Sequence, residues 1–322
     1  MNVQPAAIRL EAASYCQLRC PSCPTTTQAI RPAVAGALLP FREFRRLLDD
    51  NPFLRSVELS NYGEAFLNPA LLQMLEYAFR KGVRLTLQNG ANLNDVSPEV
   101  LEGLVRYRFQ ALRCSIDGAS PETYRQYRRR GSFEQVIENI RTINRHKAEL
   151  GSPEPQLIWQ FIVFGHNEHE IGTARQKAAE LGMDFQLKLN WDETFSPIRD
   201  RERVRREARL AAVTREEHRQ RTGQMYAQSI CRQLWTQPQI NADGTMLGCC
   251  RNYWGDFGGN AFRDGLLGAV NHEKMRYARA MLTGHAPARA DIPCTTCDLY
   301  LHRRASGQWL RVGPAPGSAP AV

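Results

Sequence analysis

The stretch that decides the fold is residues 7–23, AIRLEAASYCQLRCPSC, in which a short apolar run leads directly into three cysteines. The run Ala7–Ala12 has the length of a buried strand, and one loop after it carries Cys16, Cys20 and Cys23. This spacing is too dense to arise by chance from nine cysteines in 322 residues. A structural zinc site takes four ligands, whereas a cubane held by three cysteines keeps one iron open. The loop therefore predicts a [4Fe-4S] cluster at the end of the first strand.

The same alternation of strand and helix continues to residue 190. Five more apolar runs have the length of strands: Ser56–Ser60, Val83–Leu87, Ala111–Ile116, Leu157–Phe164 and Asp184–Leu189. Helical patterns separate them: Phe41–Asp50, a segment from Pro69 to Gly82, a segment from Ser97-Pro98, a segment with a Ser132/Gln135 capping box, and Glu168–Leu181. Six strand–helix repeats predict an α/β fold with parallel strands and right-handed crossovers. An open doubly wound sheet and a six-stranded barrel-like sheet both fit this pattern, and in both ligands bind at the carboxyl ends of the strands.

Polar motifs follow the predicted strands at those ends. Gly63-Glu64 follows the second strand, Asn89-Gly90 follows the third, and Ser115-Ile116-Asp117-Gly118 ends the fourth. With the CxxxCxxC loop in front of them, these motifs resemble the radical S-adenosylmethionine (SAM) superfamily. The resemblance implies a partial (β/α)6 TIM-like barrel in which the open iron of the cluster binds SAM. Reductive cleavage of SAM then gives a 5′-deoxyadenosyl radical, which takes a hydrogen atom from an unactivated carbon.

The resemblance also assigns SAM-binding residues. Tyr62-Gly63-Glu64 looks like the family's glycine–glycine–glutamate motif, with Tyr62 in the first position, and would hold the methionine ammonium group. Asn89 belongs to a common strand-end motif, and Ser115 would reach the ribose or the carboxylate of SAM. Gln160 is a further candidate for the carboxylate. Ser22 stands where many members carry an aromatic side chain against the adenine.

A second group of cysteines lies near the end of the chain: Cys231, Cys249, Cys294 and Cys297. A zinc ribbon is one interpretation. The spacing Cys231-x12-Gly244-x4-Cys249, followed by CxxC, resembles the truncated SPASM extension called twitch, which implies a second, auxiliary [4Fe-4S] cluster. Four thiolates leave no open iron, so this cluster would transfer electrons. The spacing favours Cys249 over Cys250 as the ligand, which leaves Cys250 as a buried spectator or a hydrogen-atom donor.

The domain organisation follows from these motifs. We expect the barrel over residues 1–192, an arginine-rich linker or bridging helix over 193–228, a twitch/SPASM-like domain over 229–310 and a disordered tail over 311–322. The third domain should contain a hairpin at Gln239–Gly248, with Asp243-Gly244 in the turn, and a helix from Leu266 to Leu282. Arg128-Arg129-Arg130 is expected to form a solvated basic patch, with one arginine near an anionic group as the alternative, and Cys114 a core residue.

Composition limits the class of protein. The chain is 43% hydrophobic and 23% charged with a net charge of +9, and it shows no secretory signal or membrane-length apolar run. Nine arginines and five acids in residues 199–221 favour a solvated, ion-paired helix over a nucleic-acid-binding arm. We therefore expect a cytoplasmic enzyme with a small-molecule substrate, a reductant such as flavodoxin or ferredoxin, and no nucleic-acid or membrane partner.

Several reactions fit these features. The resemblance to twitch-type enzymes favours a dehydrogenase (an oxidoreductase) acting on a carbinol carbon of a sugar-like small molecule or natural product. A radical epimerase that returns hydrogen from Cys250 or Cys249 is the alternative. A peptide maturase ranks lower, because the first strand begins within about ten residues of Met1 and leaves no peptide-recognition module. A zinc protein that binds nucleic acid is the non-enzymatic alternative.

Overall fold

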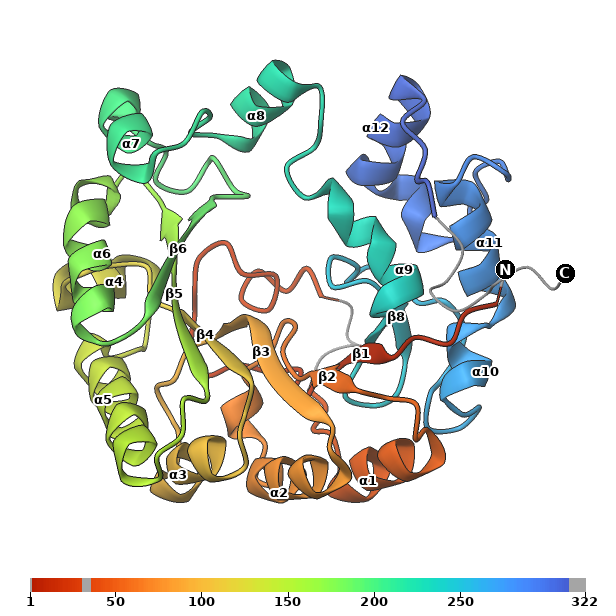
Figure 1. Ribbon diagram of the computed structural model, residues 1–322. Coiled ribbons are helices and arrows are strands. Elements are labelled where there is room, and N and C mark those ends of the chain that lie inside the picture. The colour runs from red at the N-terminus through yellow and green to blue at the C-terminus, as the bar shows by residue number, and fades with distance from the viewer. Residues whose placement is uncertain (1, 31–35, 313–322) are drawn as a thin grey trace, which may run out of the picture.

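The structure is a computed structural model that describes residues 2–30 and 36–312, so residues 313–322 of the predicted tail lie outside the described chain. In these residues eight strands form one sheet in the order β6-β5-β4-β3-β2-β1-β7-β8 (Figure 1). Their bounds are β1 Ala7–Leu10, β2 Ser56–Glu58, β3 Arg84–Ala91, β4 Ala111–Ser115, β5 Gln156–Val163, β6 Asp184–Leu189, β7 Gln239–Ile240 and β8 Met246–Gly248. All six strands predicted before residue 190 are present.

The strand order decides between the two predicted arrangements. Strands β1 to β6 are parallel and neighbour one another in chain order, with no reversal. Crossovers of one hand then place every helix on the same face, whereas a doubly wound sheet reverses its order and carries helices on both faces. Figure 1 shows the crossover helices around the outside of a curved sheet: α1 Phe41–Asp50, α2 Leu71–Lys81, α3 Pro98–Arg106, α4 Pro121–Tyr127, α5 Phe133–Glu149 and α6 Ile171–Glu180. The fold is the barrel-like one, left partial because the sheet ends at β6 and β8.

Local sequence signals place the helix ends. Gly82 ends α2 in the left-handed conformation at φ 68°, and the Ser97 hydroxyl accepts a hydrogen bond from the Val100 amide at the start of α3. Only one of the two hydrogen bonds of the predicted capping box at Ser132 is present. The Ser132 hydroxyl accepts from the Gln135 amide, but the Ser132 amide donates to Asn94 on another loop. Helix α4 was not predicted.

Residues alternate between the two faces of the strands. Ile8, Leu10 and Val57 are fully buried in the core that the outer helices cover. On the opposite face Arg9, next to Ile8, donates to Gln239 of β7 and lies 4.0 Å from Glu58. The inside of the barrel is therefore polar, which suits a cavity for a polar ligand.

The C-terminal part continues the barrel sheet. The predicted hairpin is formed by antiparallel β7 and β8, with Gly244 in the turn at φ 87°, and β7 pairs with β1 in parallel. The remaining α-helices are α7 Arg201–Ala208, α8 Arg215–Thr222, α9 Gln233–Thr236, α10 Leu266–Val270, α11 Glu273–Leu282 and α12 Asp298–Ser306. Four short 3-10 helices complete the described elements: η1 Ala65–Leu67, η2 Glu168–Glu170, η3 Gln228–Arg232 and η4 Pro293–Thr296.

Two segments that were predicted as one continuous helix each contain two helices. The arginine-rich stretch is broken into α7 and α8, with Arg209 in the left-handed conformation at φ 55° after α7. The predicted helix 266–282 is likewise divided, because the chain leaves helical geometry at Asn271-His272 between α10 and α11. The expected ion pairs are present, as between Arg203 and Glu207 at 3.5 Å. Among the described residues, every helix is too short or too polar to cross a bilayer.

Candidate active site

A cavity of about 1240 Å³ lies at the carboxyl ends of the barrel strands. Cys16, Cys20 and Cys23 line it, as does Cys250 from the C-terminal part. The six residues that the sequence assigned to SAM binding also line it: Tyr62, Gly63, Glu64, Asn89, Ser115 and Gln160. The structure thus brings residues from β1 to β5 and the loops after them to one site. These residues span about 150 positions of the sequence.

One buried carboxylate fixes the loop that contains Tyr62-Gly63-Glu64. Oε1 of Glu11, just after β1, accepts hydrogen bonds from the Tyr62 and Gly63 amides at 2.7 Å each. The Glu64 amide donates to the carbonyl of Tyr15, beside the first thiol. Burial raises the pKa of Glu11 to about 7, although the two amides oppose the shift. Glu11 therefore holds the 62–64 loop against the three-thiol loop.

Gly63 and Gly90 are required by close packing. A Cβ on Gly63 would lie 1.9 Å from the Ala13 carbonyl oxygen, so no larger residue fits while the loops stay in contact. Gly90 has φ of 121°, and a Cβ there would lie 2.3 Å from the Ser115 hydroxyl. The glycines keep the second and third strand ends close to the neighbouring loop and to Ser115.

Polar side chains contact the three thiols. The Asn92 side-chain amide donates to Cys16 Sγ at 3.5 Å, and Nη1 of Arg128 donates to Cys20 Sγ at 3.7 Å. Arg128 is held by Asp117, whose Oδ2 accepts from the arginine Nε at 2.7 Å. Hydrogen-bond donors and a positive charge beside cysteine sulfur stabilise a thiolate ligand.

The thiols themselves fit a bound cation. Burial first, and then the charges of Glu64 and the neighbouring thiols, raise the pKa of Cys16 to about 12. Burial also raises the pKa of Cys20 to about 11, despite the opposing charge of Arg128. Buried thiols so close together become thiolates only when a metal centre neutralises them. Together with Cys23 they give three thiols in one loop at the cavity wall, and this set fits a cubane with one open iron.

Glu64 places a second buried carboxylate at the cavity wall. Its carboxylate is buried and accepts from the Asn92 amide at 2.6 Å and the Phe66 amide at 3.3 Å. Burial raises its pKa to about 7, and the two amides lower it. An ammonium group in the cavity would favour the ionised carboxylate, as a methionine ammonium does.

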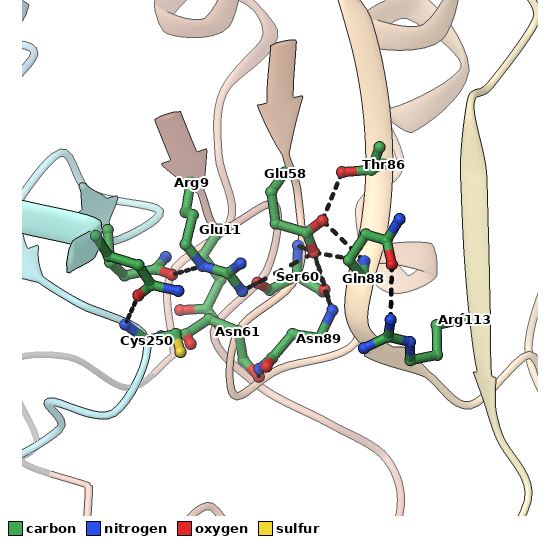
Figure 2. Close-up of polar contacts among 12 residues, drawn as sticks. Arg9, Glu11, Glu58, Ser60, Asn61, Thr86, Gln88, Asn89, Arg113 and Cys250 are labelled. Atoms are coloured by element: carbon green, nitrogen blue, oxygen red, sulfur yellow. Dashed lines mark hydrogen bonds and ion pairs between the residues drawn. The ribbon is translucent and has the colours of Figure 1, made fainter. Parts of the chain in front are cut away.

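A charged network inside the barrel positions Asn89 (Figure 2). Glu58 accepts hydrogen bonds from the Ser60 hydroxyl, from the Gln88 amide at 2.8 Å and from the Asn89 amide at 3.2 Å. The Asn89 side chain then donates to the Asn61 carbonyl at 2.8 Å. Both polar atoms of the Asn61 side chain are buried at the cavity wall without a hydrogen-bond partner in the described chain. Such an amide is a binding group for a polar ligand.

The second group of thiols also comes together. Burial raises the pKa of the Cys294 thiol well above its ordinary value, and the three other thiols of the predicted group raise it further. Cys249 likewise has a raised pKa, from burial first and then from its neighbours Cys250 and Cys231. None of the four predicted ligands is among the described residues that line the cavity, whereas Cys250 is. Cys250 therefore lies at the cavity wall, whereas the adjacent Cys249 lies outside the cavity lining.

The sequence did not identify several residues of the site. Arg128 was expected in a solvated patch, with one arginine of the triplet near an anionic group of SAM or substrate as the alternative. Its side chain is only 12% exposed and pairs with Asp117, because the turn after α4 directs it inward. Glu11, Asn61 and Asn92 were not singled out at all. Two signals were available: a charged residue at the end of an apolar strand, and an asparagine directly after one. Cys114 is fully buried in the core, as expected.

Comparisons with known proteins agree with this geometry. A curated relative, the AdoMet-dependent heme synthase of Methanosarcina barkeri, is 28% identical over 184 residues, 56% of this chain. The match spans 49% of that protein, about half of its length. Crystal structures of SuiB from Streptococcus suis bound to S-adenosylmethionine and of BtrN in complex with AdoMet and 2-DOIA share the fold. Their TM-scores are 0.65 and 0.50, each at 14% identity over 92% of this chain, covering 71% and 94% of those chains.

A family model covers the barrel itself. The model of the radical SAM superfamily matches residues 10–175, just over half of the chain. The matched segment contains the three-thiol loop, the 62–64 motif, Asn89, Ser115 and Gln160. The chain belongs to the radical SAM superfamily.

Proposed function

We propose that the protein is a radical SAM dehydrogenase that oxidises a carbinol carbon of a sugar-like small molecule. The observation that carries this proposal is the placement of two unequal groups of thiols. Three thiols line the cavity and would leave an iron for SAM, whereas four lie together outside the cavity lining and would leave none. A cluster held by these four thiolates would accept an electron and would leave no iron for the substrate.

The geometry of the second group supports a cluster over zinc. Tetrahedral zinc with Zn–S bonds of about 2.3 Å needs its four sulfurs about 3.8 Å apart. Within residues 2–30 and 36–312, no three Cys, His, Asp or Glu side chains, those of the loop with Cys16, Cys20 and Cys23 included, are close enough to share a single metal ion. A cubane places its own iron and sulfide atoms between the ligands, so its thiolates stand farther apart.

The reaction balances without another oxidant. Bound SAM supplies a radical that takes the hydrogen atom from the substrate carbon. The substrate then loses its hydroxyl proton to a carboxylate and one electron toward the four-thiol group, and becomes a ketone. We assign this proton to Glu193, a carboxylate that lines the cavity beside Arg215. The electron released equals the electron used to cleave SAM, so one SAM is consumed per ketone.

Tyr62 supports electron transfer between the two groups. Its hydroxyl donates to the Cys250 carbonyl at 2.7 Å, and its ring meets Tyr253 edge to face at 5.7 Å. The backbone of the same residue is bound to Glu11 beside the three-thiol loop. A single residue thus joins the SAM-binding motif to the segment that carries Cys249. A flavodoxin or ferredoxin is the class of protein expected to supply the first electron.

Product analysis tests the proposal. Iron-loaded protein with SAM, dithionite and a panel of polyols and glycosides should give a ketone and 5′-deoxyadenosine in a 1:1 ratio. With substrate deuterated at the carbinol carbon, the deuterium should appear in 5′-deoxyadenosine. A product that keeps the oxidation level of the substrate would overturn the assignment.

Epimerisation is the second candidate, because Cys250 lines the cavity. In that reaction the Cys250 thiol would return a hydrogen atom to the opposite face of the substrate radical, and the thiyl radical would then need reduction. The product would be an isomer that carries solvent deuterium, and Cys250→Ala would abolish its formation. A ketone formed equally well by Cys250→Ala excludes this candidate.

A further inference from the structure

Five Lys and Arg side chains line the cavity, and they divide into two kinds. Three are ion-paired with an acidic neighbour at 2.5–2.7 Å: Arg128, Arg219 and Arg251. The other two, Lys188 and Arg215, form no ion pair with any residue in 2–30 or 36–312. Cations inside a cavity are normally paired, so these two need another explanation.

Both unpaired cations lie at the end of β6. The Lys188 ammonium donates to Gln160 Oε1 at 3.3 Å. Nε and Nη2 of Arg215 donate to the Leu189 carbonyl at 3.4 and 3.3 Å, and the guanidinium lies 4.9 Å from the centre of the Tyr226 ring. These are long bonds to neutral oxygens. They leave most of the donors of both groups free for a ligand.

The two charges oppose each other in the free protein. Burial and, after it, the charges of Arg113 and Arg215 together lower the pKa of Lys188 to about 8. Burial also lowers the pKa of Arg215. Lys188 is nevertheless cationic at pH 7, since its pKa lies above that value. An anion bound between the two groups would relieve both the repulsion and the cost of burial.

Their surroundings indicate which molecule carries the anion. Lys188 contacts Gln160 and interacts with the charges of Cys250 and Asp117, whereas Arg215 interacts with those of Arg251, Asp298 and Glu193. Arg215 and its neighbours form the C-terminal wall of the cavity, and Lys188 lies between this wall and Gln160. An anion held by both cations would therefore extend from Gln160 toward the C-terminal wall, away from Glu64.

We propose that Lys188 and Arg215 bind a carboxylate or phosphate group of the substrate, so that the enzyme acts on an acidic small molecule. The proposal deepens the proposed function, since it assigns a charge to the sugar-like substrate. It excludes aminoglycoside-like polycations, which these two side chains would repel. A uronic acid or a sugar phosphate has the required chemistry.

Binding to the iron-loaded, SAM-bound and unreduced protein tests this subsite without turnover. The probes are D-glucuronate and inorganic phosphate, with D-glucose as the uncharged comparison, and calorimetry measures their affinities. We expect both anions to bind at least about tenfold more tightly than glucose, a difference of about 1.4 kcal/mol. Lys188→Met and Arg215→Met should each remove this preference, and SAM affinity should stay within about twofold.

A thermal measurement separates a binding role from a structural one. Lys188→Met removes an unpaired buried charge and keeps the apolar stem, so the melting temperature of the free protein should hold or rise. Stabilisation by added phosphate should be lost. The matched control is Lys177→Met: that lysine donates to the Ala119 carbonyl and does not line the cavity, so phosphate binding should be unchanged.

Two outcomes would overturn the subsite. Equal anion affinity in wild type and both cavity variants would show that the anions bind elsewhere. Loss of SAM affinity in the variants would assign the cations to the carboxylate of SAM. Failure of the proposed function is a separate result: absence of a ketone product under reducing conditions would leave a measured preference for anions intact.

Discussion

Cys20→Ala is expected to lower the yield of 5′-deoxyadenosine by about a thousandfold or more, equivalent to about 4 kcal/mol in the barrier. Cys20 is the buried one of the three thiols in the loop after β1, and the Arg128 guanidinium contacts its sulfur. Two thiols cannot hold a cubane with a defined open iron, so SAM would lose its binding site. Iron should fall by about four atoms per chain, while the second group keeps its own.

Cys114→Ala is the matched control for that substitution. Cys114 is also a buried thiol, but it lies within β4 in the hydrophobic core and does not line the cavity. Its loss should cost about 1 kcal/mol of stability through the small space it leaves, with iron content and SAM cleavage unchanged. Chromatographic assay of 5′-deoxyadenosine with iron analysis measures both variants. If Cys20→Ala cleaved SAM as well as the wild-type protein does, Cys20 would not be a ligand of the cluster.

The second large effect concerns two adjacent cysteines. Cys249→Ala should lower ketone formation by about a hundredfold or more, because the electron from the substrate loses its acceptor. SAM cleavage should continue, since the three-thiol loop is untouched. Iron content should again fall by about four atoms per chain. The expectation follows from the position of Cys249 among the thiols of the second group, outside the cavity lining.

Cys250→Ala is the internal comparison, with the same change one residue away. Cys250 lines the cavity, and its backbone is fixed by hydrogen bonds from Tyr62 and to Gln233. The side chain can therefore be removed with the loop in place, and iron content and ketone yield should both match wild type. The reverse pattern, with iron lost from Cys250→Ala and kept in Cys249→Ala, would make Cys250 the ligand.

Much of the barrel could be predicted from the sequence because its signals are local. Each strand is a short apolar run, and caps such as Ser97 and Gly82 act within one turn of their helix. The choice between an open sheet and a barrel could not be made from periodicity. It depends on strand order, and on β7, which pairs with β1 from about 230 residues further along the chain.

In the site, too, local patterns could be predicted from the sequence, whereas tertiary contacts could not. Spacing alone identified the three-thiol loop, because its ligands lie within eight residues. Arg128 and Lys188 carry no such signal: one is the first of three consecutive arginines, and the other is a single lysine in an apolar strand. Their places in the cavity follow from the turn after α4 and from which face of β6 points into the barrel. Both are set by tertiary packing.

The measurement that tests the central claim most directly is the yield of 5′-deoxyadenosine from wild-type protein. The protein is loaded with iron and sulfide without oxygen, then mixed with SAM and dithionite. If the three cavity-lining thiols hold a cubane with one open iron, 5′-deoxyadenosine and methionine should form in equal amounts. Neither product should form in the variant that lacks all three thiols. Fully loaded wild-type protein that leaves SAM intact would contradict the account.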